Sequence, residues 1–319
     1  MAGLQTLHIT SIRDMSESDL RRILERAQEI KSKPTSYYGR LTGMILGLAF
    51  WEASTRTRLS FESAMLRLGG QTSGFSSNLG TSLEKGESLS DTVTMLSSYT
   101  DGIVIRHPLR GSAKLAAEIA DRFGVPVISG GSGSQEHPTQ AILDIFTIRE
   151  KLGRLSGLNV GLIGDLRYSR TISSLLFALS KFGKNTIYAV SHPSLRLQDE
   201  LKFDLKGTNL VLVENDNLSE VMEELDVLYV TRLQKERFPD PDLYNKVKGS
   251  SQLRMSLLKG VKKELIILHP LPRVDEIPYE VDRSGHAFYF EQARNGVFTR
   301  MAILDFLLGD KKRSDMGAE

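Results

Sequence analysis

The sequence predicts an α/β protein of two doubly wound parallel-sheet domains joined by helices. Short apolar runs of strand character alternate with segments of helical apolar spacing over nearly all of its 319 residues. This alternation is typical of βαβ units, which build a parallel sheet with helices on both faces. The length suits about two domains of ordinary size, and a glycine- and serine-rich run at 130–134 interrupts the rhythm between the halves.

The first half is predicted to open with a helix, because Ser16 precedes Asp19 by three residues and apolar residues then recur on one face. After it, the apolar runs predict four strands and the periodic segments predict three helices. The polar stretch 76–87 contains few apolar side chains and predicts an exposed loop. The strands are expected near 44–50, 71–75, 102–106 and 125–129, and the helices at 59–68, 88–99 and 112–123.

The second half repeats this architecture, with a first helix from Pro138 to about Leu152. Strands are expected near 159–163, 186–190, 210–213, 227–230 and 265–268, with helices between them. A last helix from Glu291 is expected to pack back on the first domain. We therefore predict one domain of residues 1–137 plus 296–319, and a second of residues 138–295.

Composition excludes several classes of function. The 41 basic and 39 acidic residues give a net charge of +2, so a nucleic-acid partner is not expected. With no cysteine, disulfides, thiol catalysis and thiolate zinc sites are excluded, and a reducing cytoplasm is compatible. The N-terminus lacks a signal pattern, and nowhere do 18 apolar residues run together. We expect a cytoplasmic protein without a membrane partner.

The stretch Ser54-Thr55-Arg56-Thr57-Arg58 lies between the predicted strand 44–50 and the helix that follows. A helix N-terminus presents unpaired N–H groups and the positive end of the helix dipole, so hydroxyls and guanidinium groups placed there suit phosphate. A simple cap with solvated arginines is the alternative. Two successive hydroxyl–arginine pairs exceed what a cap requires, and the phosphate interpretation is favoured.

Five further strand ends carry arginine, histidine or amide side chains. Each cluster alone could be a solvated loop, but five together suit bidentate recognition of phosphate and carboxylate, without a protein nucleophile. The third glycine of a dinucleotide turn is missing after Gly161 and Gly164, and neither a P-loop nor H-E-x-x-H occurs, so no cofactor and no metal are expected. The clusters are Arg106-His107, His137-Pro-Thr-Gln140, Asp165 to Arg170, Thr231-Arg-Leu-Gln234 and His269-Pro-Leu-Pro-Arg273.

These motifs carry a resemblance that spans almost the whole chain. Ser54 to Arg58 resembles the carbamoyl-phosphate motif of the transcarbamoylases, and the clusters at His137, Thr231 and His269 resemble those of aspartate transcarbamoylase catalytic chains in particular. Ornithine transcarbamoylases typically have a cysteine after the final histidine, where this chain has Pro270. The resemblance implies transfer of the carbamoyl group of carbamoyl phosphate to L-aspartate in pyrimidine biosynthesis. In the Arg170 motif, Arg167 and Ser169 stand where lysine and glycine are common.

The resemblance also implies a role for each matching residue. Arg56, Thr57, Arg106, His137 and Lys85 would be catalytic. The phosphate would be held by Ser54, Thr55, Arg56 and Thr57, and the carbonyl oxygen by Thr57, Arg106 and His137. Gln140 and the backbone of Pro270 and Leu271 would bind the carbamoyl amine, with Leu271–Pro272 expected to be a cis peptide. The aspartate carboxylates would bind Arg170, Arg232 and Gln234.

Transcarbamoylases form trimers in which a neighbouring chain contributes a serine and a lysine to the active site. Ser82 and Lys85 match these, so a homotrimer with shared active sites is implied, and a regulatory chain is a further potential partner. Two alternatives stay open: a transcarbamoylase for another amino acid, and a catalytically silent protein of the same fold.

Overall fold

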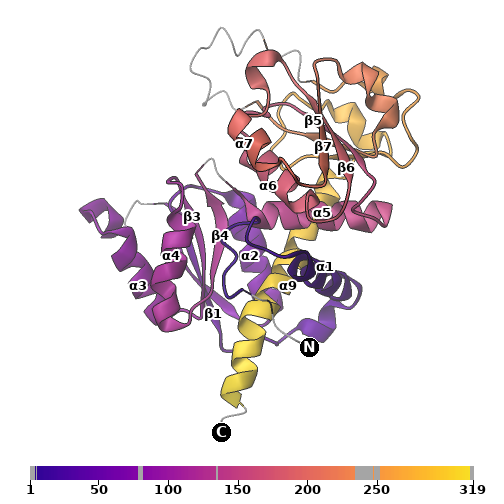
Figure 1. Ribbon diagram of the computed structural model, residues 1–319. Helices are drawn as coiled ribbons and strands as arrows, with labels where there is room; N and C mark the ends of the chain where they lie inside the picture. The colour runs from indigo at the N-terminus through magenta and orange to yellow at the C-terminus, as the bar shows by residue number, and fades with distance from the viewer. Residues whose placement is uncertain are drawn as a thin grey trace. The chain divides into compact units, whose positions relative to one another are not determined.

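The computed structural model describes residues 4, 6–77, 82–133, 136–233, 247 and 252–316. The chain divides into two compact units: Met1–Ile142 with Asn295–Glu319 is unit 1, and Leu143–Arg294 is unit 2. Each unit contains one parallel sheet with helices on both faces, so the predicted fold class is confirmed (Figure 1). Two helices, α5 (Pro138–Leu152) and α9 (Tyr289–Met316), run from one unit into the other.

The sheet of unit 1 has the strand order β2-β1-β3-β4 and is parallel throughout. Its strands are β1 (Ile45–Phe50), β2 (Gln71–Phe75), β3 (Gly102–His107) and β4 (Val127–Ser132). The chain leaves β1 toward β2 and then returns to the other side of β1 to form β3. This reversal makes the carboxyl ends of β1 and β3 a topological switch point, the usual place for a ligand in an open α/β sheet.

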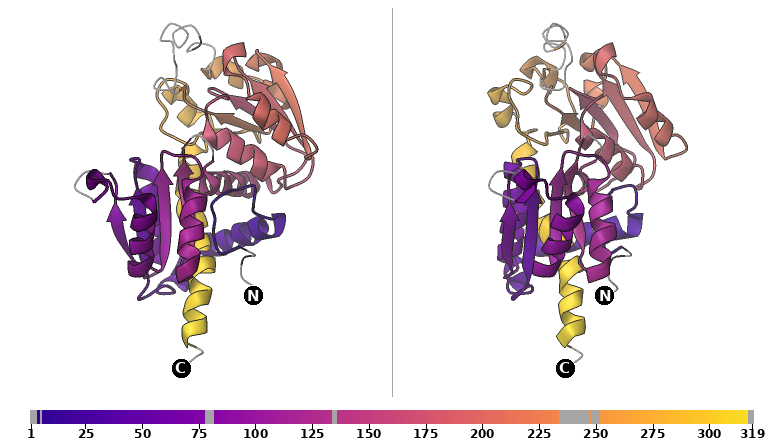
Figure 2. Two further views of the ribbon diagram at one scale, coloured as in Figure 1. Left: turned by 60° about the vertical axis from the view of Figure 1, so that its left-hand side comes forward. Right: turned by 90° about the vertical axis from the view of Figure 1, so that its left-hand side faces the viewer.

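Helices cover both faces of this sheet. Figures 1 and 2 show α3 (Leu89–Tyr99) and α4 (Ser112–Ala120) on one face, and α2 (Thr55–Arg67) on the other. Alternate strand residues point to opposite faces, so Ala49, Ile103 and Ile105 pack with Val93 of α3 and the alanines of α4. The first helix is α1 (Glu17–Ser32), and the hydroxyl of Ser16 accepts a hydrogen bond from the Asp19 N–H, as expected for its N-cap.

The C-terminal part of α9 packs on unit 1, as the sequence predicted. Asp305, which is 2% exposed, forms ion pairs with Arg26 and Arg40. Lys31 of α1 donates a hydrogen bond to Asn295 at 2.9 Å. Apolar residues of α9, among them Ile303 and Leu304, are also buried, and burial stabilises a fold by about 25 cal/mol for each Å² of apolar surface removed from water.

The sheet of unit 2 has the order β7-β6-β5-β8-β9, again parallel. The chain builds outward through β6 and β7, then returns to the other side of β5 for β8, so the second switch point lies between β5 and β8. Helices α6 and α7 follow β5 and β6. The bounds are β5 (Asn159–Ile163), β6 (Asn185–Val190), β7 (Leu210–Asn215), β8 (Val227–Val230), β9 (Ile266–Leu268), α6 (Arg170–Leu179) and α7 (Asp199–Asp204).

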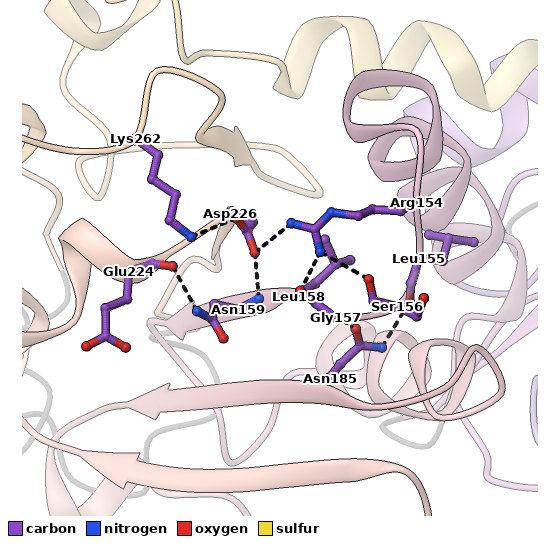
Figure 3. A network of polar contacts seen from close by, with 10 residues as sticks. All are labelled: Arg154, Leu155, Ser156, Gly157, Leu158, Asn159, Asn185, Glu224, Asp226 and Lys262. Carbon is purple, nitrogen blue, oxygen red and sulfur yellow. Dashed lines mark hydrogen bonds and ion pairs between the residues drawn. The ribbon is translucent and has the colours of Figure 1, made fainter.

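The amino ends of β5 and β8 are held by a polar network around Asp226 (Figure 3). Its carboxylate accepts hydrogen bonds from Lys262 and from the Asn159 N–H, both at 2.8 Å, and pairs with Arg154 at 3.3 Å. Burial by itself would raise the pKa of Asp226, but these hydrogen bonds and charges together lower it. The network fixes the sheet edge opposite to the carboxyl ends, so its function is structural.

The run 130–134 differs from the sequence prediction. Its glycine and serine content predicts an interruption of the strand–helix alternation, but Gly130, Gly131 and Ser132 continue β4 and are buried. Because these residues have no side chain or a small one, this strand end lies close to neighbouring groups. A Cβ on Gly130 would lie 3.5 Å from the Thr57 methyl group. The periodicity of apolar residues could not predict this strand end, because glycine and serine contribute no apolar side chain to the pattern.

Candidate active site

In unit 1, α2 begins at the carboxyl end of β1, and Ser54 to Thr57 form its N-cap and first residues. Ser54 occupies the N-cap position with extended backbone, but its side chain makes no capping hydrogen bond. The hydroxyl is therefore not used in the way that the capping alternative requires. Burial lowers the pKa of the Arg56 guanidinium, which stays charged at neutral pH, so an anion bound there would offset the cost of desolvation.

Thr57 and His137 meet beside this helix N-terminus. The Thr57 hydroxyl lies 3.3 Å from His137 Nε2, and the two residues are 7% and 5% exposed. His137 immediately precedes α5, while Thr57 lies in the first turn of α2, so two helix starts bring the pair together. Two adjacent polar groups that can donate hydrogen bonds suit a developing negative oxygen.

Arg106 lies in β3, which pairs with both β1 and β4. Its Nη1 donates to the Gly130 carbonyl oxygen at 3.1 Å, and its Nη2 lies 3.6 Å from the Glu52 carboxylate. The side chain is 12% exposed, so these two contacts orient a mostly enclosed guanidinium at the switch point. Unit 1 thus brings Thr57, Arg106 and His137 to one sheet edge, with Ser54 to Arg56 beside them.

The neighbouring His107 is also enclosed. Its Nδ1 accepts a hydrogen bond from the Leu109 N–H at 3.1 Å, and its ring contacts Trp51 edge-on at 5.1 Å between centroids. Burial lowers the pKa of His107, and the charge of Glu52 offsets part of that shift. A neutral His107 therefore supports the strand end on which Arg106 lies.

Sequence reasoning missed Glu136, which holds the segment before His137. Its carboxylate, 4% exposed, accepts hydrogen bonds from the Ser11 hydroxyl and, at 2.8 Å, from the Ile12 N–H, and it pairs with Arg13. Burial raises the pKa of Glu136, and these contacts offset part of the shift. The partners are more than 120 residues away along the chain, so no local signal in the sequence could have identified this anchor.

In unit 2, Arg170 follows β5 and Arg232 follows β8, the two strands that flank the second switch point. Both side chains are half-buried. The two strand ends approach closely at Gly164, where a Cβ would lie 2.0 Å from the Thr231 carbonyl oxygen. Gly164 has a φ of +105°, so glycine is required there for this approach as well as for the backbone.

The cluster after β9 forms a turn that is held by a buried pair. His269 Nε2 lies 2.7 Å from the Glu276 carboxylate, and His269 Nδ1 accepts a hydrogen bond from the Leu271 N–H at 2.8 Å. Leu271–Pro272 is a cis peptide, as predicted, and Leu271 has a φ of +57°, a backbone conformation uncommon outside glycine and often found at functional sites. Pro270 and Leu271 are half-buried, and Pro272 is exposed.

The structure gives fewer contacts for the remaining predicted site residues. Ser82 and Lys85 lie in a short 3-10 helix, Ser82–Lys85, and both side chains are exposed in unit 1. Gln140 is half-buried in the first turn of α5. Gln234 lies outside the described residues. No group of three or more histidine, aspartate or glutamate side chains in the described part of the chain could hold a metal ion, and no helix there is long and apolar enough to cross a membrane.

Fold and site together define an α/β enzyme for small anionic substrates. Residues 7–150 match the carbamoyl-phosphate-binding domain of aspartate/ornithine carbamoyltransferases, and residues 156–307 match their Asp/Orn-binding domain. The chain belongs to the aspartate/ornithine carbamoyltransferase family, which confirms the resemblance of its motifs.

Individual relatives match nearly the whole chain. The sequence is 50% identical over 305 residues to the aspartate carbamoyltransferase catalytic subunit of Thermococcus gammatolerans, covering 94% of this chain and 97% of that protein. The catalytic subunit of M. jannaschii aspartate transcarbamoylase is similar in structure, with a TM-score of 0.88, 45% identity and coverage of 96% and 99%. A Trypanosoma cruzi aspartate transcarbamoylase in complex with carbamoyl phosphate and aspartate gives a TM-score of 0.87 at 35% identity, with coverage of 94% and 96%.

Proposed function

We propose that the chain transfers the carbamoyl group of carbamoyl phosphate to the amine of L-aspartate, giving N-carbamoyl-L-aspartate and phosphate. One observation carries the proposal. The Thr57–His137 pair and Arg106 lie at the same sheet edge as a helix N-terminus whose Ser54 hydroxyl is not used for capping. The family match supplies the substrates, since relatives about half identical to this chain are aspartate carbamoyltransferase catalytic subunits.

In this proposal, unit 1 binds carbamoyl phosphate. Ser54, Thr55, Arg56 and Thr57 hold the phosphate at the N-terminus of α2, where backbone N–H groups and the helix dipole favour negative charge. Arg106, Thr57 and His137 donate to the carbonyl oxygen. That oxygen gains negative charge when the amine attacks, so these donors stabilise the transition state more than the bound substrate.

Unit 2 binds the acceptor. Arg170, Arg232 and Gln234 hold the two carboxylates of aspartate, and Gln140 with the backbone of Pro270 and Leu271 binds the carbamoyl amine. Once the substrates are oriented, the aspartate amine attacks the carbonyl carbon and the tetrahedral intermediate collapses. Phosphate leaves with the C–O bond electrons and takes up the proton that the amine loses. Orientation contributes several kcal/mol to such a step, so the reaction needs no protein nucleophile and no cofactor.

The proposal includes a cytoplasmic homotrimer in which Ser82 and Lys85 enter a neighbour's site. The exposure of both side chains in a polar segment supports it, because the Lys85 ammonium forms no ion pair with the residues that the structure describes and suits an anion bound elsewhere. The mass of the native protein would test the trimer, cell fractionation would test the location, and co-purification would reveal a regulatory chain.

The reaction is tested by incubating the enzyme with carbamoyl phosphate and, in turn, aspartate, ornithine and N-acetylornithine. We expect the highest kcat/KM with aspartate. Arg170→Ala should raise the KM for aspartate about 10- to 100-fold, because a charge-assisted hydrogen bond contributes about 1.5–3 kcal/mol. Arg254→Ala, which removes an exposed arginine from the same unit, should change little. Faster turnover of either ornithine would refute the choice of acceptor, and no turnover of any acceptor would favour a silent binding protein.

A further inference from the structure

A cavity of about 350 Å³ lies in unit 2 beside the carboxyl ends of β5 and β6. Arg167 contributes from the turn between β5 and α6, and the segment 193–202 after β6 contributes the rest of the lining. This is the flank of β5 opposite to β8, and neither Arg170 nor Arg232 lines the cavity. It is therefore separate from the side chains assigned to aspartate.

The charges of the lining do not balance. Lys202 is neutralised by Glu214 at 2.8 Å and by Asp199 at 3.3 Å. Within the described ranges, Arg167 and Arg196 have no carboxylate within ion-pair distance, and the Nε of Arg196 is buried without a hydrogen-bond partner. Arg167 is exposed and Arg196 is half-buried, so the buried Nε of Arg196 is the donor that a bound anion would satisfy, and the two positive charges at one cavity favour such an anion.

The local backbone holds these two arginines in place. Leu195 and Leu197, on either side of Arg196, are 1% and 3% exposed, so the segment is anchored by burial. Gln198 Nε2 donates to the Arg167 carbonyl oxygen at 2.7 Å, which ties the segment to the β5–α6 turn. The arginines are thus presented by backbone that is already fixed, which lowers the entropy cost of binding.

We propose that this cavity is a second oxyanion site and that it binds inorganic phosphate between Arg167 and Arg196. Each planar guanidinium offers paired N–H donors that match two oxygens of one anion, and a volume of this size accommodates a small molecule. A dicarboxylate such as succinate shares this chemistry and is the competing ligand.

The test is equilibrium dialysis of radiolabelled phosphate against the native protein and its variants. We expect two classes of site in the unmodified chain, with one lost in Arg56→Ala and the other weakened at least 10-fold in Arg167→Ala and in Arg196→Ala. Arg254→Ala is the matched control and should retain both. Loss in Arg56→Ala reports on the substrate site alone, so failure of the proposed function and failure of this inference are distinguishable.

Two further measurements keep the result interpretable. Arg196→Lys preserves the charge and the apolar stem, and should weaken phosphate binding less than Arg196→Ala while the melting temperature stays unchanged. Equal phosphate binding by the unmodified chain, Arg196→Ala and Arg196→Lys would overturn the proposal. Displacement of phosphate from this class by succinate at a tenfold lower concentration would overturn the assignment to phosphate.

Discussion

Replacement of Arg106 by alanine separates a catalytic role from a structural one. The guanidinium contacts the Gly130 carbonyl oxygen at 3.1 Å and the Glu52 carboxylate at 3.6 Å. Glu52 is 36% exposed, so water can solvate it after the substitution, and a pair of this kind contributes about 0.2–1 kcal/mol to stability. Loss of the hydrogen bond to the buried Gly130 carbonyl oxygen adds about 1–3 kcal/mol, so for a protein of this size the melting temperature should fall by no more than about 8 °C.

The effect on the reaction should be much larger. Removal of one donor to a developing oxyanion lowers kcat about 10²- to 10³-fold, or about 2.7–4 kcal/mol. Arg106→Lys keeps the positive charge but not the paired N–H donors, so its kcat should lie between those of the unmodified chain and Arg106→Ala. Arg110→Ala, which removes an exposed arginine of the same unit, is the control.

The assay is steady-state formation of N-carbamoyl-L-aspartate with both substrates saturating, alongside thermal unfolding of each variant. The reasoning would be refuted by Arg106→Ala turnover within about fivefold of the unmodified chain, since no oxyanion donor is so weak. A fall in melting temperature of more than about 10 °C would also contradict it, because the loss of activity would then follow the loss of fold.

Three further predictions concern assembly and stability. Lys85→Ala and Arg106→Ala chains, each inactive alone, should regain about one quarter of full activity when they are unfolded together and reassembled. In random trimers of the two chains, about a quarter of the shared sites contain neither change. No recovery of activity in well-formed mixed trimers would refute the shared site. The lowered pKa of His107 means that the unfolded chain takes up the proton first below pH 6.5, so stability present above that pH falls as the pH drops, and urea unfolding should show a smaller fall for His107→Gln. Asp226→Asn should lower the unfolding free energy by about 1–2 kcal/mol and leave kcat unchanged. Because the lowered pKa of Asp226 stabilises the fold only above about pH 3.8, the variant should lose less stability than the unmodified chain below that pH. A large loss of kcat would contradict the structural role of Asp226.

The sequence by itself determined the fold class and most of the elements. Apolar periodicity is a local property, so β5 and β8 were predicted with the bounds that the structure has, and the two-sheet architecture followed from their alternation with helices. The motifs at Ser54 and His269 were equally local, and they led to the family that the comparisons confirm. The glycine-rich end of β4 was predicted wrongly because a strand buried for close packing need not contain apolar side chains.

Tertiary structure decided which groups support these motifs. Glu136 reaches the Ile12 N–H across 124 residues, and Gly164 is required by the Thr231 carbonyl oxygen, a backbone atom that no side-chain pattern reveals. The cavity at Arg167 likewise depends on Arg196, which reads in the sequence as one more surface charge. Contacts of this kind form only when distant segments pack together, because the sequence sets each segment's preference and the fold sets its neighbours.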